Sequence, residues 1–115
     1  MSTGAIGAKP DKCNIAASGG TSTHILVNQC DRKLAFKIKS TNNANYSVNM
    51  IAGFLEEAKE LPLIITRNPG KAKADKLVIQ FCDAKPGQAD ALAHFNGTPS
   101  GEVVGETVIK ISAAE

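Results

Sequence analysis

The side chains that could act as a catalytic base or a metal ligand are few in this chain and far apart in the sequence. The two histidines are His24 and His94, and neither stands in a motif that also supplies a nucleophile. The ten glycines occur singly or in turn dipeptides and form no phosphate-binding motif. We therefore expect no enzymatic activity, no metal site and no cofactor. His24 is expected at the edge of the core with a hydrogen bond to the backbone, and His94 on the surface.

Three cysteines, Cys13, Cys30 and Cys82, have spacings that do not match those of zinc ligands. Cys30 and Cys82 could instead form the bridge between the two sheets of a secreted immunoglobulin domain. Both lie at the ends of their predicted strands, the chain has no tryptophan to pack on a bridge, and a secretory signal is missing. We therefore expect reduced thiols and no disulfide.

Length and charge narrow the class of protein further. A chain of 115 residues fits one domain, which we place at 1–115. The 13 basic and 11 acidic side chains give a net charge of +2, too weak a field for general binding of nucleic acid or anionic membranes. No stretch approaches the roughly 18 apolar residues of a membrane span. We expect a cytoplasmic protein with no nucleic-acid partner and no membrane insertion.

The elements that must position the remaining polar groups are β-strands. With four Phe, one Tyr and no Trp, the core must be built mainly of Ile, Val and Leu, which favour sheet. The clearest strand is 33–40, where apolar residues facing the core alternate with outward-facing Ala35, Lys37 and Lys39. The same alternation recurs in 61–65 and in 76–81.

Seven strands in total are expected, at 12–17, 22–29, 33–40, 46–48, 61–65, 76–81 and 102–111. This pattern predicts an all-β, seven-stranded immunoglobulin-like β-sandwich, with one short helical segment at 87–95 before the last strand. Pro62 indicates a strand at a sheet edge, because proline cannot donate a hydrogen bond to a neighbouring strand. Residues 55–61 contain good helix formers but are too few for a stable helix, so we expect a turn there.

One group of residues suggests a binding surface. The third and sixth strands of such a sandwich are neighbours, so outward-facing Lys37 and Lys39 are expected beside outward-facing Lys76 and Val78. A basic stripe with an apolar notch could bind an acidic extended peptide or the matching surface of another copy. The alternative is a charged outer face that only keeps the protein soluble, and the residues leave both open. The lysines of 71–76 are expected at a solvated hairpin tip.

The segment LAFKIKSTNNANYSV at 34–48 resembles the signature of the major sperm protein (MSP) domain. In that signature a strand ending in Lys, Ser or Thr, and Thr runs into a polar bend and then into Tyr-x-Val. Segments 19–30, 53–60 (as the next bend) and 75–81 are also similar to the family. The resemblance extends over a core of about residues 5–111. It implies a sandwich of the MSP/PapD-like type that serves assembly or adaptor roles without enzymatic activity.

The resemblance gives the corner at 41–45 two roles. Its small polar residues are expected to satisfy backbone groups through side-chain hydrogen bonds, and its asparagines tolerate positive backbone angles. Adaptor members of the family bind acidic peptides on this face. The candidate residues for contact with a peptide or protein partner are therefore Lys37, Lys39, Ser40, Thr41, Lys76 and Val78.

Three departures from the family pattern weaken an acidic-peptide site. Asn45 stands where an Arg or Lys is common, Met50 where Pro is usual, and Glu56-Glu57 where Asp-Pro is usual. The chain thus loses a cation and gains two acids. The long segment 82–101 before the last strand is similar to that of small stand-alone sperm-specific members.

Members of the sperm branch form symmetric dimers that polymerise into filaments. The resemblance therefore implies a structural or regulatory component of the nematode sperm cytoskeleton, located in the sperm cytoplasm, that acts through protein contacts and forms a homodimer. An adaptor that binds acidic peptide motifs is the alternative. No anchor or coiled coil is expected after the domain.

Overall fold

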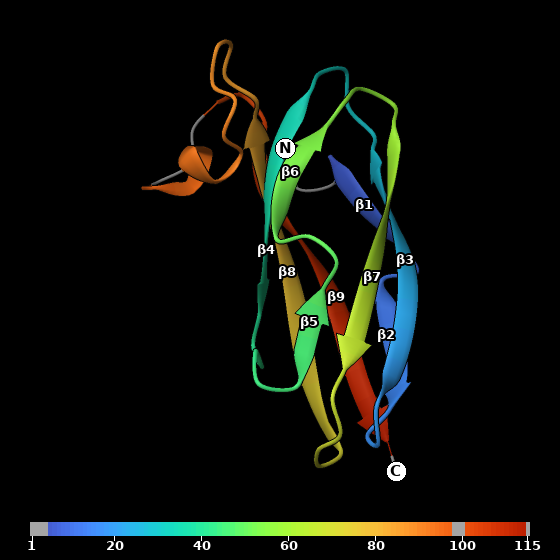
Figure 1. Cartoon of the computed structure of the whole chain (residues 1–115). Coiled ribbons are helices and arrows are strands. Elements are labelled where there is room, and N and C mark those ends of the chain that lie inside the picture. Colours follow the sequence, from blue (N-terminus) through green and yellow to red (C-terminus); the bar gives the residue numbers. More distant parts are fainter. Residues whose placement is uncertain (1–4, 98–100, 115) are drawn as a thin grey trace.

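The structure, a computed structural model, describes residues 5–97 and 101–114. In this part of the chain nine strands form two facing sheets, with strand orders β1-β3-β7-β5 and β2-β9-β8-β4-β6 (Figure 1). The strands are β1 (Ile6–Lys9), β2 (Lys12–Ala16), β3 (Gly20–Asn28), β4 (Leu34–Ser40), β5 (Tyr46–Val48), β6 (Ala52–Leu55), β7 (Glu60–Arg67), β8 (Lys73–Asp83) and β9 (Val104–Ala114). A short 3-10 helix, η1 (Leu92–Phe95), precedes β9. The predicted sandwich with one helical segment before the last strand is confirmed.

Each sheet buries one face because apolar residues alternate along its strands. Phe36 of β4 and Phe81 of β8 lie opposite each other and are fully buried. Leu63 and Ile65 of β7 belong to the same apolar cluster from the other sheet. Removing this surface from water is the main favourable contribution to folding. The inward faces predicted for these strands are confirmed.

Two short strands, β1 and β6, are absent from the sequence prediction. The bend predicted at 53–60 begins as β6, in which Gly53 pairs with Phe36 of β4. A Cβ atom at Gly53 would lie 3.0 Å from Cζ of the Phe36 ring, so the glycine permits close packing inside a sheet. The chain then turns and β7 begins at Glu60. The turn expected in place of a helix at 55–61 is therefore confirmed.

A helical cover lies over one end of β4, which the alternation of a strand cannot predict. Ala35 lies on the outer side of β4, as predicted, but it is fully buried because η1 packs against β4. His94 is buried rather than on the surface. Its Nε2 accepts a hydrogen bond from the backbone N–H of Lys85 at 3.0 Å, and its ring meets the ring of Phe54 edge to face at 5.6 Å. The prediction of a surface position for His94 is therefore wrong, and the helical cover also removes Ala35 from solvent.

The connection from β7 to β8 is not a hairpin. β7 belongs to the first sheet and β8 to the second, so residues 68–72 cross between the layers. The prediction of a hairpin tip at 71–76 is therefore wrong, because Lys73 and Lys76 lie within β8. As a result, Lys76 is held on a sheet face.

Pro62 does not lie in an edge strand, because β7 pairs with both β3 and β5. Proline cannot donate a hydrogen bond to a neighbouring strand, and on one side of Pro62 no strand in the described part of the chain is paired. β5 pairs with β7 only as far as Ile65, so Pro62 lies beyond the end of β5. There Asn49 Nδ2 donates a hydrogen bond to the Pro62 carbonyl at 3.3 Å. A missing backbone N–H is tolerated at this open position.

The chain passes from one sheet to the other between β1 and β2, after a cis Lys9-Pro10 peptide bond. His24 of β3 is fully buried beside this crossing. Its Nδ1 donates to the Pro10 carbonyl at 2.7 Å, and its Nε2 then accepts from Ser22 Oγ at 2.8 Å. The prediction of a histidine bonded to the backbone is confirmed.

The sandwich measures 45 × 25 × 22 Å, and its connections gather at the two ends of the long axis (Figure 1). The Glu57 end, at the top of Figure 1, carries residues 29–33, 56–59, 84–97 and 101–103. The Lys71 end carries residues 17–19, 41–45 and 68–72. Both names are used below.

Candidate protein-binding face

The polar corner between β4 and β5 satisfies its own backbone with side chains. The N–H of Asn42 donates to Ser40 Oγ at 3.0 Å, and that of Asn45 donates to Asn42 Oδ1 at 3.1 Å. Asn42 Nδ2 donates to Asn45 Oδ1 at 3.1 Å and to Asp75 Oδ2 at 3.2 Å. The predicted side-chain bonding is confirmed. Positive backbone angles play no part, since among the described non-glycine residues only Ala58 has one, at 60°.

Thr41 is tied to β8 through its backbone and its side chain. Its N–H donates to the Lys76 carbonyl at 3.0 Å, and its hydroxyl donates to Asp75 Oδ1 at 3.1 Å. The same hydroxyl oxygen accepts from the N–H of Lys76 at 3.0 Å. The hydroxyls of Ser40 and Thr41 are thus both engaged within the chain. They fix the backbone that carries Lys39 and Lys76.

Arg67, buried between the sheets, joins the segments of the Lys71 end. Its Nε donates to the Ala17 carbonyl at 3.2 Å, and its Nη2 donates to the Lys71 carbonyl at 2.7 Å. Its Nη1 donates to the Tyr46 hydroxyl at 2.7 Å. Burial raises the pKa of Tyr46, and the hydrogen bond from Arg67 opposes that rise. The sequence gives no sign of this role, because an arginine at the end of a strand is usually exposed.

Strand register decides which candidate residues meet on the outer face of the second sheet. β4 and β8 are neighbours, as predicted, and Lys39 lies opposite Val78. Val78 in turn lies opposite Val108 of β9, which is 38% exposed. Lys37 lies opposite Gln80, four residues along β8 from Lys76 and thus roughly 13 Å away. The predicted stripe is therefore continuous at Lys39 and Val78 but does not bring Lys37 beside Lys76.

Beside Lys76 the same face carries two lysines that the sequence analysis missed. Lys76 lies opposite Lys110 of β9, and Lys110 lies opposite Lys12 of β2. This row of three exposed lysines borders a hollow of about 380 Å³ whose lining includes Ala74 and Ser112. Alternation could have placed Lys110 outward. Lys12 depends on the parallel pairing of β2 with β9, which local sequence does not reveal.

Like charges on directly opposite strand positions repel each other. Within residues 5–97 and 101–114, no ion pair to a carboxylate offsets the charges of Lys12, Lys76 and Lys110. We call these three side chains and the hollow beside them the lysine hollow. The arrangement provides positive charge over a floor of small side chains, which suits an acidic segment of another protein.

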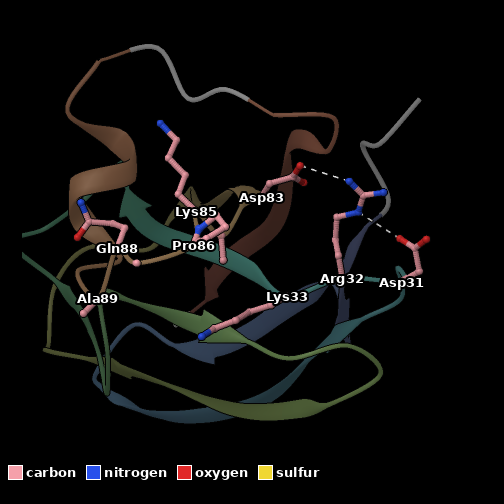
Figure 2. A pocket seen from close by; sticks show the side chains of 10 residues that line it. Asp31, Arg32, Lys33, Asp83, Lys85, Pro86, Gln88 and Ala89 are labelled. Atoms are coloured by element: carbon pink, nitrogen blue, oxygen red, sulfur yellow. Dashed lines mark hydrogen bonds and ion pairs between the residues drawn. The ribbon is translucent and has the colours of Figure 1, made fainter.

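A second hollow, of about 660 Å³, lies at the Glu57 end between residues 31–33 and 83–89 (Figure 2). Arg32 lies within reach of three carboxylates there, at 3.2 Å from Asp31, 3.3 Å from Asp83 and 3.4 Å from Glu102. Asp83 also accepts the backbone N–H of Glu102 at 3.0 Å. Arg32 is thus paired with the carboxylates around it. These contacts hold the segment at Arg32 and the segment at Glu102 against the end of β8.

The described residues offer little for catalysis or metal binding. Cys13, Cys30 and Cys82 are free thiols, and burial raises the pKa of Cys13 and Cys82. No three His, Cys, Asp or Glu side chains in the described ranges come together as a metal site. Nor does any helix in these ranges have the length and apolar character needed to cross a membrane.

Formal charges separate along the long axis of the sandwich. The half at the Glu57 end carries eight carboxylates and six cations: Asp31, Glu56, Glu57, Glu60, Asp83, Asp90, Glu102 and Glu106 against Lys9, Arg32, Lys33, Lys37, Lys59 and Lys85. The half at the Lys71 end carries seven cations and two described carboxylates: Lys12, Lys39, Arg67, Lys71, Lys73, Lys76 and Lys110 against Asp11 and Asp75. The described part of the molecule therefore has an acidic half and a basic half.

Comparison with known proteins agrees with the fold. The MSP (Major sperm protein) domain family matches residues 6–99. Sperm-specific class P protein 9/11 of Caenorhabditis elegans is 45% identical over 97 residues, which are 84% of this chain and 89% of that protein.

The structure of SSP-19, an MSP-domain protein like family member in C. elegans, has a TM-score of 0.84 at 38% identity and covers 94% of this chain and 98% of its own. The PapD-like domain of human CEP192 shares the fold at 12% identity, with a TM-score of 0.67 over 100% of this chain and 90% of its own. The fold is thus the two-sheet sandwich of the MSP/PapD-like type, and the relatives include sperm-specific nematode proteins. The chain belongs to the MSP domain family.

Proposed function

We propose that this protein is a non-enzymatic structural or regulatory component of the nematode sperm cytoskeleton that acts in the cytoplasm through contacts with other proteins. The family and its sperm-specific members support the setting. The observation that carries the proposal is the outer face of the second sheet, where Lys39, Val78 and Val108 lie in one row. Val108 is exposed and Val78 is partly exposed, and apolar side chains that reach solvent among charges are typical of surfaces that meet proteins.

The histidine environments support a role without catalysis. Ser22 and His24 lie at 2.8 Å, as a nucleophile and its base would. Yet His24 is fully buried, and Ser22 lies on the inner side of β3. Neither of the two hollows described above is lined by this pair. The role of His24 is structural: its hydrogen bond to the Pro10 carbonyl holds β3 to the segment that crosses between the sheets, and Ser22 bonds its other ring nitrogen.

Contact with a second copy is the simplest protein contact for this chain. The outer strands of the two sheets in the described ranges are β1, β5, β2 and β6, and each leaves one edge without a neighbouring strand. Such edges can pair with another chain, and a dimer made in this way would be symmetric. Sedimentation over a concentration series tests it. We expect the average mass to rise toward that of a dimer, and a monomer at every concentration would exclude the homodimer.

Binding of an acidic peptide is a second candidate function, favoured by the position of Lys39 opposite Val78 with Lys76 one row away. Titration with an acidic, Phe-containing peptide should give an affinity that falls about tenfold or more in the double variant Lys39→Glu, Lys76→Glu. The matched control, Lys59→Glu with Lys85→Glu, makes the same charge change at the Glu57 end. Equal affinity in the two variants would exclude this face.

A further inference from the structure

Lys12 and Lys110 of the lysine hollow take no part in the contacts proposed above, yet their positions suggest a binding site. Lys12, Lys76 and Lys110 stand at consecutive register positions on three strands, so each unbalanced charge is one strand spacing, about 4.8 Å, from the next. The hollow beside them opens outward and is concave. The three lysines repel one another, and an acidic group that binds in the hollow reduces this repulsion.

The edge of the hollow is also an open sheet edge. In the parallel pair of β2 and β9, the N–H of Lys110 donates to the Asp11 carbonyl and the N–H of Ala17 donates to the Ala114 carbonyl. The odd-numbered residues of β2 therefore direct their backbone groups toward β9. Lys12 and Asn14 direct theirs away from it, toward the side where the described part of the chain has no further strand.

A convex acidic tip stands at the other end of the molecule. The turn between β6 and β7 is closed by a hydrogen bond of 3.1 Å from the N–H of Lys59 to the Glu56 carbonyl. Glu57 and Glu60 are exposed and form no ion pair with another described residue, whereas Glu56 lies 3.5 Å from Lys33 Nζ. We call Glu57 and Glu60 with this turn the acidic tip.

We propose that the lysine hollow of one molecule receives the acidic tip of a second copy of this chain, in a head-to-tail contact. The two surfaces have opposite charge, one is concave and the other convex, and they lie in opposite halves of a 45 Å molecule. This inference rests on the proposal that the protein acts through contacts with other proteins, and it names the partner and the surfaces.

Such a contact joins different patches of the two molecules, so it differs from a symmetric dimer. The bound pair still has a free tip at one end and a free hollow at the other, and the contact can therefore repeat as an open chain. Because exposed charges dominate it, the contact is weak and depends on ionic strength. At an ionic strength near 0.01 M the screening length is about 30 Å, and at 1 M it is about 3 Å.

Charge reversal at each end tests the contact in the full-length protein. One variant reverses the tip, Glu57→Lys with Glu60→Lys, and the other reverses the hollow, Lys12→Glu with Lys110→Glu. Sedimentation at low ionic strength should show association of the wild type that weakens about tenfold or more in each variant alone. An equimolar mixture of the two variants should associate again, because each then offers the charge that the other lacks. A chain with all four substitutions should self-associate for the same reason.

Two matched controls carry the same change in net charge outside the contact. Glu102→Lys with Glu106→Lys matches the tip variant, and Lys9→Glu with Lys85→Glu matches the hollow variant. Both controls should associate as the wild type does. The thermal melt of each variant, followed by circular dichroism, checks that it is folded.

The outcomes separate this inference from the proposed function. Association of the wild type that persists unchanged at high ionic strength, or in the reversed variants, overturns the head-to-tail contact but leaves a contact between copies standing. A mixture of the two reversed variants that stays monomeric also overturns it. A wild type that is monomeric at low ionic strength overturns both this contact and the homodimer. The salt comparison uses the wild type alone, so it holds even if a variant fails to fold.

Discussion

Arg67 donates a hydrogen bond of 2.7 Å to the hydroxyl of Tyr46, and both side chains are buried where three segments of the Lys71 end meet. A guanidinium in this position is satisfied by the carbonyls of Ala17 and Lys71 rather than by a carboxylate. The corner before β5 and the crossing after β7 are thereby held to the turn before β3. Because the Lys71 carbonyl lies just before β8, these hydrogen bonds also position the start of the strand that carries Lys76.

Replacing the buried guanidinium should therefore destabilise the fold strongly. Arg67→Met keeps much of the apolar stem but removes the donor to the Tyr46 hydroxyl and to the Lys71 carbonyl, and leaves the Ala17 carbonyl with the N–H of Gly70 alone. We expect a loss of about 3 kcal/mol in the free energy of unfolding, or about 10 °C in Tm. Urea denaturation measures it. The control Lys71→Met removes an exposed cation and should change stability by less than about 0.5 kcal/mol; equal losses in both variants would contradict the account.

The hydroxyl of Thr41, one of the candidate binding residues, is expected to stabilise the corner between β4 and β5. Thr41→Val keeps the shape of the side chain but removes the donor to Asp75 and the acceptor for the N–H of Lys76. Stability should fall by about 1–2 kcal/mol. Thr23→Val, on the exposed side of β3, is the matched control and should be nearly neutral. A neutral Thr41→Val would mean that the corner does not depend on this hydroxyl.

Gly53 tests the packing of β6 on β4. In Gly53→Ala the new methyl group would lie 3.0 Å from Cζ of the fully buried Phe36 ring, which has little room to move. Overpacking of this kind should cost about 1–3 kcal/mol. Gly97→Ala places its methyl group in open space and is the control. If thermal melts of the two variants coincide, the close approach of Gly53 to Phe36 is not real.

Alkaline pH should lower stability through the buried thiols. Burial raises the pKa of Cys82 and Cys13 in the folded protein, so the folded state keeps protons that the unfolded state loses. Their stabilising contribution is complete below the unfolded thiol pKa of about 8.5 and is lost as the pH rises above it. Urea denaturation at neutral and alkaline pH should show this fall, and Cys82→Ala should flatten it. An identical pH dependence in Cys82→Ala and the wild type would refute the assignment to Cys82.

The parts of the fold that sequence could predict are those in which neighbouring residues determine the structure. Alternation placed Phe36 and Phe81 in the core, and the short polar run before Tyr46 indicated a corner closed by side chains. The sequence did not predict β6, because glycine is typical of a bend. The reason for a glycine at position 53 is the ring of Phe36, which lies in another strand.

The candidate face was predictable only where one pair of strands defines it. Lys39 and Val78 lie on β4 and β8, whose antiparallel pairing follows from the order of strands in the sandwich. Lys12 joins the face through a parallel pair between residues about 100 positions apart, which no local pattern encodes. The burial of His94 likewise depends on a distant partner, Phe54.

The central claim is that this protein works through contacts between its outer surfaces and other proteins, its own copies included. Sedimentation equilibrium of the wild-type chain at low ionic strength, over a wide range of concentrations, tests it most directly. The account predicts an average mass that climbs above the monomer as concentration rises and falls back when salt is added. One constant monomer mass at every concentration and ionic strength would contradict it.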